Sequence, residues 1–119
     1  AGAILAAIPD SGIDVMMGVG GAAEGVVAAC AVKSLRGAMI LRLAPQSDEE
    51  RQRVQDSGLD STRIMCQDEV VQSDQIFFAA TGVTDGMLLD GVHYGGGFAR
   101  THSLVLRAKT GPRRMIRAE

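Results

Sequence analysis

One carboxylate, Glu24, lies inside a glycine-rich loop, in the stretch Gly18-Val-Gly-Gly-Ala-Ala-Glu-Gly25. The stretch follows an apolar run at residues 13–17 and opens an apolar-periodic segment that predicts a helix. The first amides of a helix have no partners within it and carry the positive end of its dipole, so a helix start of this kind suits a phosphate. A carboxylate there would repel a bare phosphate, and a divalent cation between the two would reconcile them.

The same residues allow simpler interpretations. Glu24 could be an ordinary first-turn carboxylate, stabilised by the dipole by about 0.3 to 1 kcal/mol, and the glycines could serve tight turning or close helix packing. Gly18-x-Gly-x-x-Ala23 also fits the loose fingerprint of dinucleotide-binding loops. That alternative needs an acid after the second strand, where the chain has Leu41-Arg-Leu-Ala-Pro45, so only a 2′-phosphate on Arg42 would suit it.

Polar side chains elsewhere give weaker signals. Thr81, Thr84 and Asp85 follow an expected strand at the end where open α/β sheets bind ligands, although turn formation explains them more simply. Arg100-Thr-His-Ser103 could hold an anion, but alternate strand residues face opposite ways, which favours cross-strand pairing. His93 has no sequence partner for catalysis. No group of residues forms a complete metal site in sequence, because one Glu does not hold a divalent ion alone.

The composition fits one globular domain. The 119 residues are 46% hydrophobic, which is enough for a single core. Twelve basic and fourteen acidic residues give a formal charge of −2, so neither nucleic acid nor a membrane surface is expected as a partner. Cys30 and Cys66 lack the spacing of a disulfide scaffold or a zinc site, which favours reduced, packed thiols and a cytoplasmic protein.

The elements that must position Glu24 are helices and strands in alternation. Residues 1–8 predict a helix without a start signal, and we therefore expect the chain to be the C-terminal part of a longer protein. A buried strand is expected over 13–17, and a central helix over 22–36 that Gly37 stops. The residues expected on the buried face of this helix are Val26, Val27, Cys30 and Ser34.

The remaining elements complete a sheet. They are expected in this order: a strand over 38–43, a surface helix over 47–56 with a capping box at Ser47-Asp-Glu-Glu50, a short strand over 63–66, a helical turn over 68–71, a buried strand over 75–80, and a hairpin of 101–108 with 113–118. The predicted fold class is α/β: a mixed β-sheet flanked by helices, with an antiparallel C-terminal hairpin.

Three segments occur in a distinctive order: Pro9-Asp-Ser-Gly-Ile-Asp followed by the loop to Gly25, Phe78-Ala-Ala-Thr-Gly-Val-Thr-Asp-Gly86, and Gly97-Phe-Ala-Arg-Thr-His-Ser-Leu-Val105. Together they resemble the C-terminal region of class II fructose-1,6-bisphosphatases, bacterial enzymes of the lithium-sensitive, metal-dependent phosphatase superfamily. The resemblance covers essentially all 119 residues, with Ala23 standing where the family commonly has Pro. It implies that residues 1–119 are a C-terminal α/β domain, the C-terminal half of a sugar-phosphatase fold.

The resemblance also implies an activity. Family members hydrolyse the 1-phosphate of fructose 1,6-bisphosphate to fructose 6-phosphate in gluconeogenesis, with Mn²⁺ or Mg²⁺ as cofactor. In the family the Glu of the Gly-Gly-x-x-Glu-Gly loop is a metal ligand, which carries over to Glu24. The second Gly of that loop contacts substrate, which carries over to Gly21. We expect a homo-oligomer, and we assign no catalytic residue within the chain.

Two motifs of the family are absent from this sequence. They are Asp-Pro-x-Glu-Gly-Thr, which supplies most of the metal site, and the Asp-Gly-Asp segment that binds the sugar. We therefore expect this chain alone to be inactive and to need the missing N-terminal half as a partner. Two other hypotheses stay open: a nucleotide- or phosphate-binding α/β module without catalysis, and a fragment that self-associates through the apolar helix at residues 1–8.

Overall fold

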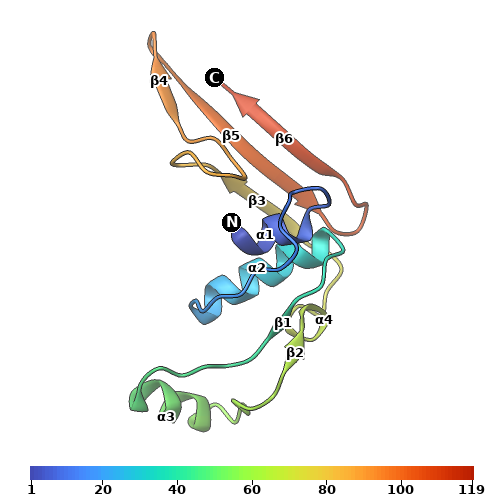
Figure 1. Ribbon diagram of the computed structural model, residues 1–119, viewed down its shortest axis with the longest axis vertical. Helices are drawn as coiled ribbons and strands as arrows, with labels where there is room; N and C mark the ends of the chain where they lie inside the picture. Colours follow the sequence, from blue (N-terminus) through green and yellow to red (C-terminus); the bar gives the residue numbers. More distant parts are fainter.

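The computed structural model describes all of residues 1–119. Its elements are α1 (Gly2–Ala7), α2 (Ala22–Ser34), β1 (Ile40–Leu41), α3 (Asp48–Asp56), β2 (Met65–Cys66), α4 (Gln67–Val70), β3 (Phe77–Thr81), β4 (His93–Gly95), β5 (Phe98–Arg107) and β6 (Arg113–Ala118). Figure 1 shows α1 and α2 beside a four-stranded sheet and α3 at the far end of the molecule. No helix combines the length and the apolar character needed to cross a membrane.

The sheet is antiparallel throughout. β3 and β4 lie on one side of the long central strand β5, and β6 lies on the other (Figure 1). The expected C-terminal hairpin is confirmed as β5–β6, with Leu104 opposite Met115. The expectation of a mixed sheet is wrong, because β1 pairs antiparallel with β2 in a separate two-stranded ladder. A mixed sheet needs at least one pair of neighbouring strands that run in the same direction. Every strand pair in this structure is antiparallel.

The core lies between the helices and β5. Leu104 and Leu106 are fully buried and pack with Ile4 of α1, Ala31 of α2 and Leu89. Side chains of a strand alternate between its two faces, so every second residue of β5 points toward the helices. Burial of each of these leucines contributes about 1.5 to 3 kcal/mol to stability.

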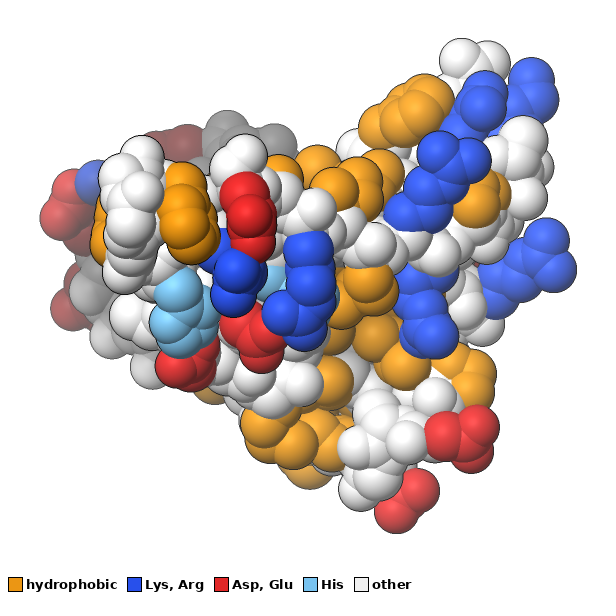
Figure 2. Space-filling view, turned by 90° about the horizontal axis from the view of Figure 1, so that it is seen from above, with side chains coloured by type: hydrophobic (Ala, Val, Ile, Leu, Met, Phe, Trp, Pro, Cys, Tyr) orange, Lys and Arg blue, Asp and Glu red, His pale blue; other side chains and the backbone are white.

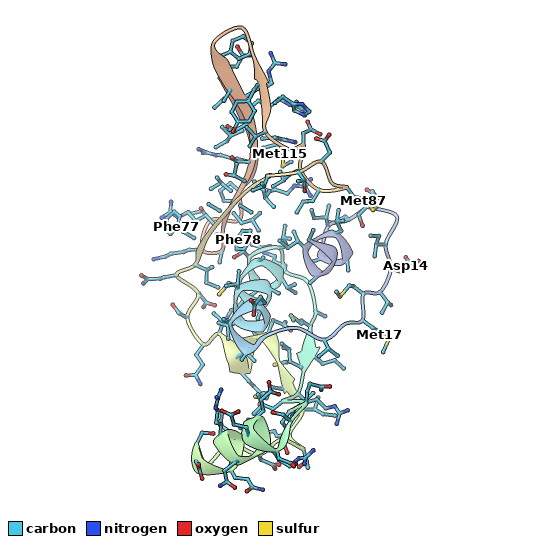
Figure 3. The ribbon with its side chains drawn as sticks, turned by 90° about the vertical axis from the view of Figure 1, so that its left-hand side faces the viewer. Asp14, Met17, Phe77, Phe78, Met87 and Met115 are labelled. Atoms are coloured by element: carbon cyan, nitrogen blue, oxygen red, sulfur yellow. The ribbon has the colours of Figure 1, made fainter.

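The opposite face of the sheet is uncovered. Phe77 is 73% exposed there, whereas Phe78 packs against the core, and Figure 3 shows the two rings on either side of their strand. The guanidinium of Arg107 lies 5.0 Å from the centre of the Phe77 ring, a cation–π contact that covers part of it. The helices therefore cover only one face of the sheet.

The strand expected over 13–17 is not formed. Residues 13–21 belong to no strand, and the backbone groups of residues 14–20 make no hydrogen bond within the protein. The side chains of Val15, Met17 and Val19 are 75%, 90% and 80% exposed. The run has the apolar composition of a strand, but no strand of this chain lies beside it to form a ladder.

Helix α2 is confirmed, but its buried face differs from the expected one. Val26 and Val27 are 47% and 55% exposed and Cys30 is half-buried, so of the four expected residues only Ser34 is buried. The buried residues are Ala29, Ala31, Val32 and Ser34. α2 carries apolar side chains on all of its sides, so the spacing of apolar residues in the sequence does not indicate which face is buried. The positions of α1 and β5 select it, and they cover only the C-terminal half of the helix.

The end of α2 is set by Arg36 rather than by Gly37. Arg36 adopts φ 58°, and its amide donates to the carbonyl of Lys33 at 3.0 Å. The amide of Gly37 donates to the carbonyl of Val32 at 2.9 Å, which completes a Schellman motif. Gly37 serves close packing instead, because a Cβ there would lie 2.7 Å from the Cβ of Ala7 in α1.

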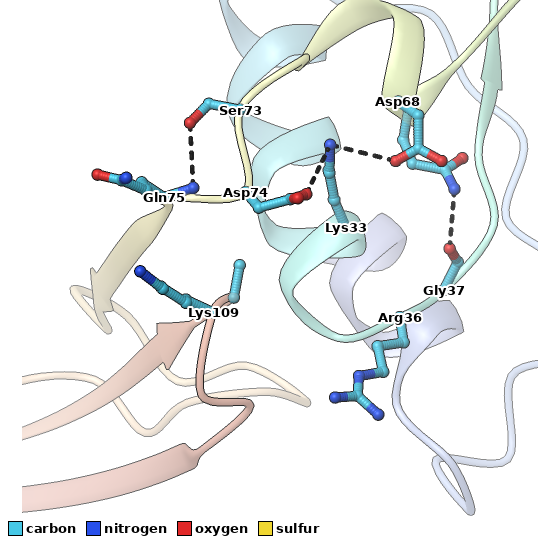
Figure 4. Close-up of a pocket in the computed structure, with 10 residues that line it drawn as sticks. Lys33, Arg36, Gly37, Asp68, Ser73, Asp74, Gln75 and Lys109 are labelled. Carbon is cyan, nitrogen blue, oxygen red and sulfur yellow. Dashed lines mark hydrogen bonds and ion pairs between the residues drawn. The ribbon is translucent and has the colours of Figure 1, made fainter.

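Lys33 connects α2 to α4 and to the loop before β3 through a hydrogen bond and two ion pairs (Figure 4). Its Nζ donates to the carbonyl of Val71 at 2.7 Å and lies 3.3 Å and 3.4 Å from carboxylate oxygens of Asp68 and Asp74. Burial by itself lowers the pKa of Lys33, but the hydrogen bonds to the two carboxylates outweigh it and raise that pKa above its ordinary value. One charged side chain thus joins three segments.

Residues 38–66 form an arm with α3 at its tip (Figure 1). The strand expected over 38–43 is reduced to β1, which pairs with β2 at the base of the arm. No residue of α3 is buried, as expected for a surface helix. The Ser47 cap is confirmed: its hydroxyl accepts from the amide of Glu50 at 3.2 Å, while the Glu50 carboxylate accepts from the amide of Gln46 at 2.7 Å.

Replacement of Gly37 by alanine should destabilise the fold, because the new Cβ would meet the Cβ of Ala7 at 2.7 Å and Cγ1 of Val32 at 3.1 Å. Over-packing of this kind lowers the free energy of unfolding by about 1 to 3 kcal/mol, which urea denaturation measures. Gly20→Ala is the matched control, since nothing lies within 4 Å of a Cβ at that position. Equal stabilities of the two variants would contradict the packing role of Gly37.

Lys33→Met should lower the free energy of unfolding at neutral pH, because Asp68 and Asp74 lose their cation. A pKa raised in the folded state contributes stability that is complete below the unfolded pKa, about 10.4, and is lost as the pH rises through the folded pKa. The difference between wild type and variant in urea denaturation should therefore be smaller at about pH 11 than at about pH 7, with the decrease beginning only above about pH 10.4.

Lys109→Met is the control for this pH dependence, because Lys109 lies nearby in Figure 4 and forms no ion pair. Its effect on the free energy of unfolding should be small at both pH values. A Lys33→Met difference that stays constant up to the higher pH would contradict the ion-pair assignment.

Candidate functional site

Glu24 lies in the first turn of α2, and its carboxylate folds back over Gly21, the N-cap residue. A Cβ at Gly21 would overlap Oε2 of Glu24, so the glycine leaves room for this carboxylate. Both residues are exposed, and Glu24 forms no ion pair. The structure thus brings together the two residues that the sequence singled out, at the amide end of a helix where an anion is favoured.

The glycines around Glu24 are not required by the backbone conformation. None of those at positions 18, 20, 21 and 25 has a positive φ. A Cβ at Gly20 would meet nothing within 4 Å, and one at Gly25 would make an ordinary contact with Leu41 at 3.6 Å. Tight turning and helix packing therefore do not explain Gly20. Close approach of a bound group to the bare backbone is consistent with its position.

The dinucleotide alternative fails on topology. That arrangement requires parallel strands before and after the helix that follows the glycine loop. Residues 13–17 form no strand, and β1, the only strand that precedes Arg42, pairs antiparallel with β2. The loop therefore lacks the sheet on which a dinucleotide fingerprint depends.

Asp85 closes its own loop rather than facing a ligand. Its Oδ1 accepts from the amide of Gly91 at 2.7 Å and lies 3.2 Å from Nε2 of His93. The Gly91 hydrogen bond, together with the nearby His93, holds the pKa of Asp85 below its ordinary value. The sequence did not reveal the pairing of His93 with Asp85, because seven residues separate them without any periodic signal. Turn formation, the simpler interpretation, accounts for Asp85.

The cross-strand pairing expected for residues 100–103 is confirmed. Oγ of Ser103 and Oγ1 of Thr81 lie 2.8 Å apart across β5 and β3. Nε of Arg100 donates to Oε1 of Glu119 at 2.8 Å. These exposed contacts are structural pairs within the sheet, and none of them leaves a free cation facing a shared site.

His102 is buried next to the ion pair of Asp90 with Arg117. Its Nδ1 accepts from the amide of Asp90 at 3.0 Å, while Oδ2 of Asp90 lies 2.9 Å from a guanidinium nitrogen of Arg117. Figure 2, seen from above, shows acidic, basic and histidine side chains adjoining on this end of the molecule. These contacts join the loop between β3 and β4 to the sheet.

No three side chains of His, Cys, Asp or Glu lie close enough together to hold a metal ion. Glu24 therefore belongs to no such group. A depression of about 730 Å³ lies near the other end of α2, between Lys33, Arg36 and Lys109 (Figure 4). Neither Glu24 nor Gly21 lines it, and Lys33 already contacts three acceptors there. The candidate site is thus the exposed start of α2 and not this depression.

Known proteins match the chain along its whole length. A family model described as bacterial fructose-1,6-bisphosphatase, glpX-encoded, matches residues 1–119. Relatives include the "Fructose-1,6-bisphosphatase class 2" of Haemophilus influenzae, 34% identical, and the "Fructose-1,6-bisphosphatase 1 class 2" of Escherichia coli strain K12, 35% identical. Each alignment covers 99% of this chain and 39% of the relative, so the chain spans about two fifths of the length of these enzymes.

These matches agree with the three segments that carry the resemblance in the sequence, and the first of those segments contains Gly21 and Glu24. The full-length match to the family model decides the question of descent. The chain belongs to the family of bacterial, glpX-encoded fructose-1,6-bisphosphatases, the class II enzymes.

Proposed function

We propose that this chain is part of a metal-dependent phosphatase that hydrolyses the 1-phosphate of fructose 1,6-bisphosphate to fructose 6-phosphate, a step of gluconeogenesis in the cytoplasm. The observation that carries the proposal is the family match over residues 1–119 together with an exposed, unpaired Glu24 in the glycine loop. Because the chain spans 39% of its relatives, the activity is that of a larger enzyme to which this part contributes.

Glu24 is proposed as one ligand of Mn²⁺ or Mg²⁺. Both ions prefer oxygen donors, and the carboxylate is solvent-exposed and free of ion pairs. When bound, the metal supplies water activation and neutralises charge on the phosphoryl oxygens. Gly21 is proposed to face the substrate, since its lack of a side chain lets a bound group approach the backbone at the start of α2.

The donor set within this chain is incomplete for either ion. Mg²⁺ takes six oxygen ligands in near-octahedral geometry, and Glu24 supplies one or two of them. We propose that the other protein ligands lie in the remaining, N-terminal part of the enzyme. In this view residues 1–119 are the C-terminal half of a sugar-phosphatase fold, assembled as a homo-oligomer, and α2 is the rigid element that aims Glu24 at the shared site.

A phosphate-binding module without catalysis is the second candidate. It is favoured by the free amides at the start of α2 and by the open backbone at Gly20. The two candidate functions differ in the role of the charge on Glu24. A metal-dependent phosphatase requires its charge, whereas a module that binds bare phosphate would bind more tightly without it.

Glu24→Gln should abolish most of the activity while leaving the fold intact. The substitution is tested in a chimera, in which this chain replaces the matching region of the Escherichia coli K12 relative. Loss of a direct ligand should lower Mn²⁺-dependent phosphate release by at least about a hundredfold, the upper end of what outer-shell changes cost. Affinity for Mn²⁺, measured by calorimetry, should fall in parallel.

Glu49→Gln is the control, because Glu49 is an exposed carboxylate of α3 that pairs only with Arg53. It removes the same charge and should leave phosphate release and Mn²⁺ affinity unchanged. If Glu24→Gln kept full activity, or bound phosphate more tightly without any hydrolysis in the wild type, the metal-ligand role would be wrong and the binding module favoured.

The isolated 119-residue chain should not release phosphate from fructose 1,6-bisphosphate, because a single carboxylate does not retain a divalent ion. A phosphate assay across a range of Mn²⁺ concentrations measures this. The isolated Glu24→Gln variant controls for a contaminating phosphatase, whose activity would be the same in both preparations. Sustained turnover by the wild-type chain that the variant lacks would overturn the proposal that the site is shared.

A further inference from the structure

We propose that residues 13–20 are a β-strand whose pairing partner is a strand in the remaining part of the enzyme, and that this pairing completes the site at Glu24. The inference rests on the proposed function, because it names the partner of the same site. It follows from four features of the segment: exposed apolar side chains, unpaired backbone groups, anchored ends and its place before the glycine loop.

The side chains of the segment suit a buried strand but face solvent. Val15, Met17 and Val19 are 75%, 90% and 80% exposed, and Met16 is 48% exposed. Figure 3 shows Asp14 and Met17 on a stretch of chain at the edge of the molecule. The Met16 side chain lies against Gly2 at the start of α1. Several large apolar side chains exposed along one short segment are typical of a site of contact with another polypeptide.

The backbone of the segment has no partners within the protein. Residues 14–20 neither donate nor accept a backbone hydrogen bond, whereas the four strands of the sheet are paired along β5. Addition of a strand to such a segment satisfies these groups through a ladder and gives the alternating side chains pockets on either face. No residue from 13 to 20 has a positive φ, so none obstructs a strand conformation.

Both ends of the segment are fixed. At its start, the amide of Ile13 donates to Oγ of Ser11 at 3.2 Å in the turn that follows α1. At its end, the carbonyl of Gly21 accepts from the amide of Gly25 in the first turn of α2. The segment thus runs between two helices that pack on the same core, which lowers the entropy cost of adding a partner strand.

The position of the segment selects the partner. Its carboxyl end leads directly into the loop that holds Gly21 and Glu24, and ligands of open α/β sheets bind at the carboxyl ends of the strands. A strand paired with residues 13–20 would therefore bring its own loops next to Glu24, where further oxygen donors are needed. About three fifths of the relatives' length lies outside the matched region and is available to supply it. A second copy would bring only another Glu24.

Hydrogen exchange measured by mass spectrometry tests the pairing. In the isolated chain, the amides of residues 14–19 should exchange at the rate of an open segment. In the chimera with the Escherichia coli K12 relative, they should exchange at least about a hundredfold more slowly, as expected for amides in a ladder. Should the chimera fail to fold, the same measurement on the Escherichia coli enzyme itself, at the positions aligned with residues 14–19, decides the question.

Proline variants of the chimera test which edges of the segment are paired. Successive amides of a strand point to opposite edges, so Met16→Pro and Met17→Pro each remove a donor from a different edge. One of the two should reduce protection if the segment is an edge strand, and both should if it is a central strand. Gln72→Pro is the control, because Gln72 is exposed and its amide makes no hydrogen bond in the structure.

Two results would overturn the inference. The first is fast exchange at residues 14–19 in both the folded chimera and the Escherichia coli enzyme. The second is protection of the isolated chain that grows with its concentration, which would make a second copy the partner. The outcome is separable from that of the proposed function. If the amides of residues 14–19 were protected but the chimera released no phosphate with Mn²⁺, the pairing would stand and the proposed function would be wrong. If the chimera released phosphate but these amides were not protected, the function would stand and the pairing would be wrong.

Discussion

The contact of α1 and α2 with β5 is the interaction on which the rest of this structure depends. Leu104 and Leu106 are the largest buried side chains of the sheet, and the helices reach them because Gly37 lets α1 approach the end of α2. This contact fixes the C-terminal half of α2. Because a helix is stiff, it also fixes the direction in which the opposite end, with Glu24, projects.

The fixed end of α2 is therefore structural, and the proposed site lies at its free end. Lys33 and the Schellman motif at Arg36 tie down the last turns. The first turns carry Glu24 and the exposed Val26 and Val27, and they follow a segment with unpaired backbone. The uncovered apolar surface and the unpaired carboxylate lie next to each other in the chain. The proposed site, shared between two parts of one enzyme, requires this arrangement.

Local signals in the sequence were sufficient where a few neighbouring residues decide the structure. The Ser47 cap, the hairpin of β5 with β6 and the helix that follows the glycine loop all depend on contacts within a short stretch, and all were predicted. The mixed sheet and the buried face of α2 were not. Both depend on which distant segments lie side by side, and an apolar run such as residues 13–17 has the same composition whether or not a partner strand is present.

The sequence by itself determined the family, through three ordered segments. It also made Glu24 a candidate from its place in the glycine loop, and Gly21 a candidate through the family resemblance. Only the tertiary structure decided that the sheet is antiparallel and that Asp85 and His93 pair with each other in a loop. It alone also decided that residues 13–20 lie without a partner. The physical reason is that hydrogen-bond ladders and buried faces are properties of pairs of segments, whereas composition and spacing belong to one segment at a time.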